Sequence, residues 1–253
     1  MDIKAYLERI DYKGPLEPDA ETLRRLQLAH LMAVPFENLS IHARQQIILD
    51  DEPLFAKIIK GRRGGFCYEL NGLFAALLRA MGFDVVMLSA GVATDEGGFG
   101  PDFDHMALMV NLEERWLADV GFGDSFLEPL RLDERGEQPQ GGGRSYQIIP
   151  DDSHLILMQR EAEEPWQPLY RFTLQPHRYS DYADMCLYHQ TSPQSHFTKG
   201  RVCSRATAYG RVTLSGMRFI RTSVGKGREE RALKNEEEYA AALQEHFGIV
   251  MTG

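Results

Sequence analysis

The hydrophobic pattern of the chain changes its period at Gly82, and this change separates a helical part from a β-rich part. Between residues 67 and 81 the apolar side chains lie three or four residues apart, which is typical of one face of an α-helix. From Phe83 the chain consists of short segments rich in valine, methionine and aromatic residues, separated by loops with glycine and aspartate. This order predicts an α+β fold in which helices precede an antiparallel sheet or barrel, followed by a mixed tail.

Further helices are expected on both sides of this boundary. Residues 18–32 carry leucines at helical spacing, and Pro35 ends the pattern because proline disfavours a helical residue before it. Residues 53–60 predict a short helix with Pro53 in its first turn, and Asn235 is expected to cap a final helix. The expected strands cover residues 83–92, 105–110, 115–120, 146–150, 154–159, 169–174, 202–207, 211–216 and 217–223, and residues 133–145 have the composition of a linker.

Charge and cysteine content argue against several classes of function. The formal net charge of -9 and the lack of a basic stripe make nucleic acid an unexpected partner. No apolar run approaches the roughly 18 residues of a membrane span, and the first residues do not resemble a secretory signal. The three cysteines (Cys67, Cys186 and Cys203) are widely spaced and form no CxxC pair, which argues against a disulfide framework and against a metal site. We therefore expect free thiols in a reducing cytoplasm.

Cys67 has the surroundings of a nucleophile. It stands at the expected start of a helix, directly after Gly64-Gly65-Phe66 and close to Arg62 and Arg63. A helix N-terminus and nearby cations both lower the pKa of a thiol. The alternative interpretation is a buried and inert cysteine, which is the commoner state of this residue.

His105 and Asp119 are candidate partners for this thiol. Residues 105–110 and 115–120 predict a β-hairpin, and a turn centred near Leu112 would place His105 opposite Asp119 on one face. Asp119 could then hold one imidazole nitrogen and leave the other for a thiol, as in acyl-transfer enzymes. Taken singly, His105 is more often a solvated histidine at the end of a loop, and Asp119 a turn-forming residue at the end of a strand.

Five segments together resemble the arylamine N-acetyltransferase family. They occur in the order of that family and span most of the chain, from about residue 34 to residue 205. The segments are Val34-Pro35-Phe36-Glu37-Asn38-Leu39, the run from Arg63 to Asn71, Asp104-His105, Asp119-Val120-Gly121-Phe122-Gly123, and the C-terminal residues Thr191-Ser192-Pro193, Phe197 and Cys203-Ser204.

The resemblance implies an architecture and a catalytic triad. Cys67 would be the nucleophile, His105 the base and Asp119 the orienting carboxylate, in a Cys-His-Asp core like that of cysteine proteinases. Residues 1–82 would form a helical bundle, residues 83–190 a central antiparallel β-barrel, and residues 191–253 an α/β lid. The length of 253 residues suits such a set of subdomains.

The same resemblance implies an activity. Family members move an acetyl group from acetyl-coenzyme A to the cysteine and then to an aromatic amine, hydrazine or hydroxylamine, with ping-pong kinetics. No metal is implied. Three alternatives share parts of the pattern: an amide synthase on the same scaffold, a cysteine hydrolase of the papain or transglutaminase type, and a non-catalytic binding module with a buried cysteine.

Residues around the triad are assigned by the same resemblance. Arg63 and Glu37 would form a charged pair that braces the Cys67 loop. Phe36 and Phe122 would form an apolar slot for the aromatic acceptor, although Phe122 could also be a simple core residue.

The implied coenzyme contacts are Phe103, Tyr188 and Gln194, the last of which replaces the small hydroxyl residue often seen in the family. Because Asp102 and Asp104 would repel a polyphosphate, basic residues are expected from Lys199, Arg201 or Arg205. Asp124 would disfavour anionic acceptors if it lined the cleft, and otherwise is a turn residue.

Overall fold

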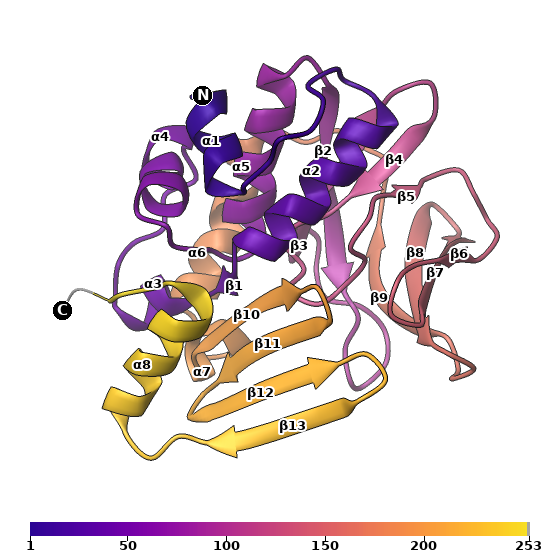
Figure 1. The fold of residues 1–253 in the computed structure, drawn as a ribbon. Helices are drawn as coiled ribbons and strands as arrows, with labels where there is room; N and C mark the ends of the chain where they lie inside the picture. Colours follow the sequence, from indigo (N-terminus) through magenta and orange to yellow (C-terminus); the bar gives the residue numbers. More distant parts are fainter. Residues whose placement is uncertain (252–253) are drawn as a thin grey trace.

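The computed structural model describes residues 1–251 as three packed parts: helices, a barrel-like sheet and a smaller sheet (Figure 1). The helices α1, α2, α4 and α5 lie together at the top of Figure 1, the strands β10–β13 form the lower layer beside α8, and β5–β9 lie to the right. None of the helices within residues 1–251 is long and apolar enough to cross a membrane.

The N-terminal helices follow the sequence pattern closely. Helix α2 (Ala20–Ala33) begins after Asp19, whose side chain accepts a hydrogen bond from the Thr22 N–H, and it ends before Pro35 as expected. Helix α5 (Cys67–Ala80) is the predicted amphipathic helix, and its apolar stripe lies in the main core. The other elements of this part are α1 (Ile3–Arg9), β1 (Phe36–Glu37), α3 (Leu39–His42), α4 (Asp51–Phe55) and the π-helical turn η1 (Ala56–Lys60).

An eight-stranded antiparallel sheet in the order β5-β4-β3-β2-β9-β8-β7-β6 follows these helices. Its edge strands β5 and β6 face each other, since the Gln138 side chain accepts from the Arg131 N–H at 2.8 Å and donates to the Arg131 carbonyl at 3.0 Å. The sheet is therefore a nearly closed barrel. Its strands are β2 (Asp84–Val92), β3 (His105–Asn111), β4 (Arg115–Ala118), β5 (Leu130–Arg131), β6 (Gln138–Pro139), β7 (Arg144–Asp151), β8 (His154–Glu161) and β9 (Gln167–Phe172).

A five-stranded antiparallel sheet in the order β1-β10-β11-β12-β13 forms the C-terminal part. Its first strand comes from the N-terminal helical part, because Phe36 and Glu37 pair with Ser204 and Cys203. The predicted final helix is α8 (Glu236–Phe247), and the Asn235 side chain caps it as expected. The remaining elements are η2 (Tyr179–Tyr182), α6 (Ala183–Thr191), α7 (His196–Lys199), β10 (Val202–Thr207), β11 (Gly210–Ser215), β12 (Arg218–Ser223) and β13 (Gly227–Ala232).

Several segments differ from the sequence-based expectation, among them the unpredicted helix α6, most of which lies within the range expected for the barrel. The segment read as a linker contains the short strand β6, and β13 was not predicted at all. Every residue of β13 is exposed, and the strand is rich in charge, as is common for strands at a sheet edge. A strand without a buried face has no alternating hydrophobic pattern, so the sequence carries no signal for it.

Candidate functional site

Cys67 is the first residue of α5 and is 3% exposed. The helix start is shaped by Glu69, whose carboxylate accepts a hydrogen bond from the Phe66 N–H at 3.1 Å. The preceding loop lies against the segment before β1, and the Glu37 N–H donates to the Gly65 carbonyl at 2.8 Å. A Cβ at Gly64 would collide with the carbonyl of Pro35, so this contact requires glycine. The Gly-Gly pair therefore permits a close backbone approach.

A buried group of charges supports this loop. Glu37 is fully buried and lies 2.8 Å from Arg63, which is the pair expected from the sequence. Glu69 is also fully buried, and Lys57 lies 2.7 Å from it. Burial raises the pKa of Glu69, and the ammonium of Lys57 acts in the opposite direction. Glu69 and Lys57 were not expected to be important from the sequence, because they lie in two separate helical elements, α5 and η1, and meet only in the fold.

His105 and Asp119 are brought together at the end of the β3–β4 hairpin. His105 Nε2 lies 2.7 Å from Asp119 Oδ2, and both residues are 2% exposed. The expected register was wrong by two residues: Leu108 pairs with Ala118, which makes Asp119 a diagonal neighbour of His105. A shift of two residues keeps both side chains on the same face, because side chains alternate with a period of two.

Residues from the helices hold Asp119 in place. Its Oδ1 atom accepts hydrogen bonds from Asn71 Nδ2 at 2.8 Å and from the Gly121 N–H at 2.8 Å. Its own N–H donates to Gln27 Oε1 at 3.1 Å. Asn71 lies one helical turn after Cys67 on α5, so the same helix positions the thiol and the carboxylate. Asn71 ends the segment from Arg63 that resembles the family, but its contact with Asp119 was not predicted from the sequence.

Gly121 allows the barrel to approach the start of α5. A Cβ at this position would lie 2.8 Å from both the Cα and the carbonyl oxygen of Cys67, and 2.7 Å from Asn71 Nδ2. Any side chain would push the hairpin away from the helix. The glycine after Asp119-Val120 thus keeps the β3–β4 hairpin close to Cys67.

Cys67 and His105 line one cavity of about 440 Å³, where the helical part, the barrel and the C-terminal sheet meet. Phe36 and Phe122 are half-buried and also line it. The Phe122 ring lies edge-on to His105, with 5.2 Å between the ring centroids. The lining residues are Phe36, Asn38, Cys67, Val92, Asp104, His105, Gly121, Phe122, His196, Phe197, Gly200, Arg201, Val202, Ser215 and Gly216.

The electrostatic surroundings of Cys67 differ from those expected. Burial raises the pKa of its thiol, and the Met106 N–H acts in the opposite direction. Arg63, which was expected to lower this pKa, is paired with Glu37 instead. Thiolate formation would therefore need a proton acceptor close to the sulfur, and Nδ1 is the ring nitrogen of His105 that Asp119 does not contact.

The three residues expected to contact a coenzyme do not line this cavity. The Phe103 ring packs edge-on against His177 and Tyr182, and its backbone has a positive φ of 65°. Tyr188 is 43% exposed on α6, and Gln194 is an exposed loop residue whose side chain contacts Ser192. The structure thus places all three outside the pocket that holds the thiol.

Of the basic residues considered, Arg201 alone lines the cavity. It is paired with Glu236, and its guanidinium lies 3.9 Å from the centroid of the Tyr239 ring. Arg205 donates to the carbonyls of Met32 and His246, and Lys199 is exposed on α7.

Asp124 does not line the Cys67 cavity. It lies 2.6 Å from Arg144 on the barrel and 3.0 Å from Arg211 on the C-terminal sheet. Burial raises the pKa of this carboxyl, but the two guanidinium groups outweigh it and hold the pKa below its ordinary value. Asp124 therefore links the two sheets.

Comparison with known proteins extends over nearly the whole chain. Residues 19–253 match a family model described as N-acetyltransferase. The arylamine N-acetyltransferase of Escherichia coli is 35% identical, over 96% of this chain and 87% of its own length. Proansamycin X synthase of Amycolatopsis mediterranei is 34% identical, over 96% of this chain and 95% of its own length.

A solved structure of the Mycobacterium marinum arylamine N-acetyltransferase in complex with CoA superimposes with a TM-score of 0.90 at 31% identity, and the match covers 98% of this chain and 93% of that one. The helical, barrel and C-terminal parts therefore follow a known arrangement. The chain belongs to the arylamine N-acetyltransferase family.

Proposed function

We propose that this protein transfers an acetyl group from acetyl-CoA to Cys67, and from Cys67 to an aromatic amine, hydrazine or hydroxylamine. The observation that carries the proposal is the buried His105–Asp119 pair, because His105 lines the same cavity as the thiol. Membership of the family supports the donor and the class of acceptor.

In the first half-reaction His105 Nδ1 accepts the proton of Cys67, and the thiolate attacks the carbonyl carbon of the acetyl thioester. Asp119 stabilises the imidazolium that forms. The free N–H groups at the start of α5 would be the hydrogen-bond donors to the oxygen on which negative charge develops. The carbon–sulfur bond of the donor then breaks, its thiolate takes the proton from His105, and acetyl-Cys67 remains.

In the second half-reaction the amine attacks the carbonyl carbon of acetyl-Cys67. His105 accepts a proton from the amine nitrogen and returns it to the sulfur of Cys67 as the thioester bond breaks. Phe36 and Phe122 would contact the aromatic ring of the acceptor, since both line the cavity. Arg63 and Glu37 would brace the Cys67 loop through their ion pair.

Several finer assignments belong to the same proposal. Phe103, Tyr188 and Gln194 would contact the coenzyme outside the cavity, where their exposed or half-buried positions leave room for a long ligand. The division into residues 1–82, 83–190 and 191–253 would describe the three parts. Strand β1 belongs to the first part in sequence but pairs with the sheet of the last part. A cytoplasmic location would suit three free cysteines.

An amide synthase is the second candidate, because one relative of similar identity is named a synthase. A hydrolase would differ from both by losing its acyl group to water. The fate of the acyl-cysteine distinguishes a transferase from a hydrolase. A transferase holds it until an arylamine is added, whereas a hydrolase releases it without an amine.

Intact-mass measurement after incubation with acetyl-CoA tests the proposal. We expect one acetyl adduct, absent in Cys67→Ala and removed by an added arylamine. Cys186→Ala and Cys203→Ala are matched controls, because both thiols are also free and buried, and both variants should keep the adduct. A wild-type protein that forms no adduct would contradict the proposed function.

A further inference from the structure

A second carboxylate–histidine pair lies beside the proposed active site and has no part in the mechanism above. His189 Nε2 on α6 lies 3.1 Å from the Oδ1 atom of Asp104, and the His189 side chain is 3% exposed. Asp104 directly precedes His105 and lines the same cavity. The pair therefore joins the residue next to the proposed base to the segment after the barrel.

Both partners are held by further contacts. Asp104 Oδ2 accepts a hydrogen bond from the Val92 N–H at 3.2 Å. Burial raises the pKa of Asp104, but the contact with His189 outweighs it, and the pKa lies below its ordinary value. Within residues 1–251 the buried His189 Nε2 atom has no other acceptor. Each group thus depends on the other, since a lone buried polar group is costly.

The contacts continue from His189 into the wall of the cavity. His189 Nδ1 lies 3.0 Å from Ser195 Oγ, and that hydroxyl accepts a hydrogen bond from the Phe197 N–H at 3.2 Å. The Phe197 ring lines the cavity and meets the His189 ring edge-on at 5.2 Å between centroids. One path of contacts therefore runs from Asp104 to the aromatic wall opposite the barrel.

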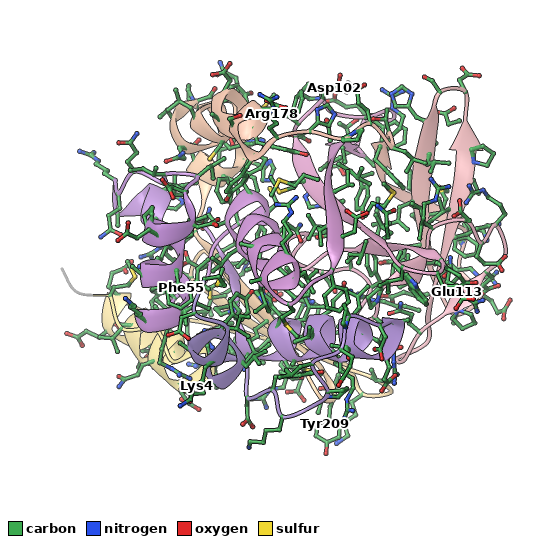
Figure 2. The ribbon with its side chains drawn as sticks, turned by 90° about the horizontal axis from the view of Figure 1, so that it is seen from above. Lys4, Phe55, Asp102, Glu113, Arg178 and Tyr209 are labelled. Atoms are coloured by element: carbon green, nitrogen blue, oxygen red, sulfur yellow. The ribbon has the colours of Figure 1, made fainter. Side chains whose placement is uncertain are left out.

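The two segments also touch at a second place. The Phe103 ring lies 4.8 Å from the His177 ring, centroid to centroid, and Figure 2 shows Asp102 and Arg178 at the same edge of the molecule. Tyr68, next to Cys67, donates its hydroxyl to the carbonyl of Phe103 at 2.6 Å. The loop before β3 is therefore packed between α5 and the segment that leads into α6.

We propose that Asp104 and His189 are positioning residues that seat the α6–α7 wall of the cavity against the segment that carries His105. The inference rests on the proposed function, because it concerns how acetyl-CoA enters that same cavity. The pair sets the width of the entrance between Phe197 and the barrel. It takes no part in proton transfer.

Steady-state kinetics and thiol alkylation together test this role. In His189→Leu we expect the KM for acetyl-CoA to rise about tenfold, since a charge-assisted contact is lost. Alkylation of Cys67 by iodoacetamide should stay within about twofold of wild type, because the thiol and its base are untouched. His189→Gln keeps a donor that can reach Asp104 and should recover a KM close to wild type. Glu113→Gln, which changes an exposed carboxylate in the turn of the β3–β4 hairpin, is the matched control and should change neither quantity.

A double-mutant cycle adds a second readout. If the two residues act as one unit, Asp104→Asn combined with His189→Leu will raise the KM no more than the stronger single variant. Additive effects would show that the residues act separately and would overturn the proposal. Should His189→Leu fail to fold, Ser195→Ala interrupts the same path with a smaller change in volume, and an unchanged KM in that variant is equally decisive against it.

Other outcomes also decide the matter. An unchanged KM in a folded His189→Leu protein overturns the proposal, and so does a loss of alkylation as large as the change in KM. A wild-type protein that forms no acetyl adduct refutes the proposed function itself. A wild type that does form the adduct, beside variants that behave like it, refutes the positioning role alone.

Discussion

His105 Nε2 and Asp119 Oδ2 lie 2.7 Å apart in a site where both residues are 2% exposed. A carboxylate accepts at both oxygens, so Asp119 can bind His105 with Oδ2 while Oδ1 accepts from Asn71 and from the Gly121 N–H. An asparagine has one acceptor oxygen and cannot satisfy all three donors. Both side-chain oxygens of Asp119 are therefore engaged by neighbouring groups.

Asp119→Asn should slow acetyl transfer by about 10²-fold, because the imidazolium of His105 loses its counter-charge and its orienting acceptor. Stopped-flow measurement of acetyl-Cys67 formation and iodoacetamide alkylation of the thiol both check this expectation. Asp133→Asn is the control, since Asp133 is an exposed carboxylate paired with Arg115 at the far end of β4. An unchanged rate of acetyl transfer in Asp119→Asn would show that the Asp119 carboxylate is not required for the reaction.

Gly121→Ala should destabilise the protein by about 2 kcal/mol, because the new methyl group would overlap the backbone of Cys67. In a chain of this size that corresponds to a fall of about 4–8 °C in the midpoint of thermal unfolding, which circular dichroism can follow. Gly141→Ala is the matched control, since a Cβ at Gly141 would meet nothing within 4 Å. Equal midpoints for the two variants would mean that the hairpin can move away from α5 without cost.

Lys57→Met should destabilise the protein in a pH-dependent way. Burial already raises the pKa of Glu69 above its unfolded value of about 4.5, and loss of Lys57 raises it further. A protein is destabilised as the pH rises through the raised native pKa of one of its carboxyl groups. The loss in free energy of unfolding of Lys57→Met, relative to wild type, should therefore be small near pH 4.5. By pH 8 it should reach about 3 kcal/mol, the usual cost of a buried charge without its partner.

Urea unfolding of Lys57→Met at pH 5 and at pH 8 measures this difference. Lys60→Met is the control, because Lys60 is an exposed residue of the same π-helical turn, and its ammonium lies over the Phe55 ring. A deficit that is constant across this pH range would show that Glu69 does not titrate in the folded protein.

Phe122→Ala should raise the KM for an aromatic amine about fivefold while acetyl-Cys67 still forms at close to the wild-type rate. The ring borders the cavity beside His105, where the acceptor must approach the thioester. Tyr209→Ala, an 80% exposed aromatic residue, serves as the control (Figure 2). Equal losses in acetylation and in acceptor binding would instead make Phe122 a support for the His105 ring.

Much of the fold follows from local patterns in the sequence. The end of α2 before Pro35, the length of α5 and the Asn235 cap of α8 agree with the structure, because capping and amphipathic spacing involve residues only a few positions apart. The face shared by His105 and Asp119 was also predicted, because alternation along a strand is local. Their register was not, since the turn around Glu113 is one residue further along than expected.

The sequence by itself predicted several of the helices, most of the strands, the family and the residues that could carry acyl chemistry. The tertiary structure alone decided which groups surround them: Asn71 and Gln27 on Asp119, Lys57 on Glu69, and His189 on Asp104. The tertiary structure also places Asp124 outside the cavity, where it pairs with two arginines. The reason is physical. Periodicity and capping act over a few residues, whereas burial brings polar groups from distant segments together because each must find a partner away from water.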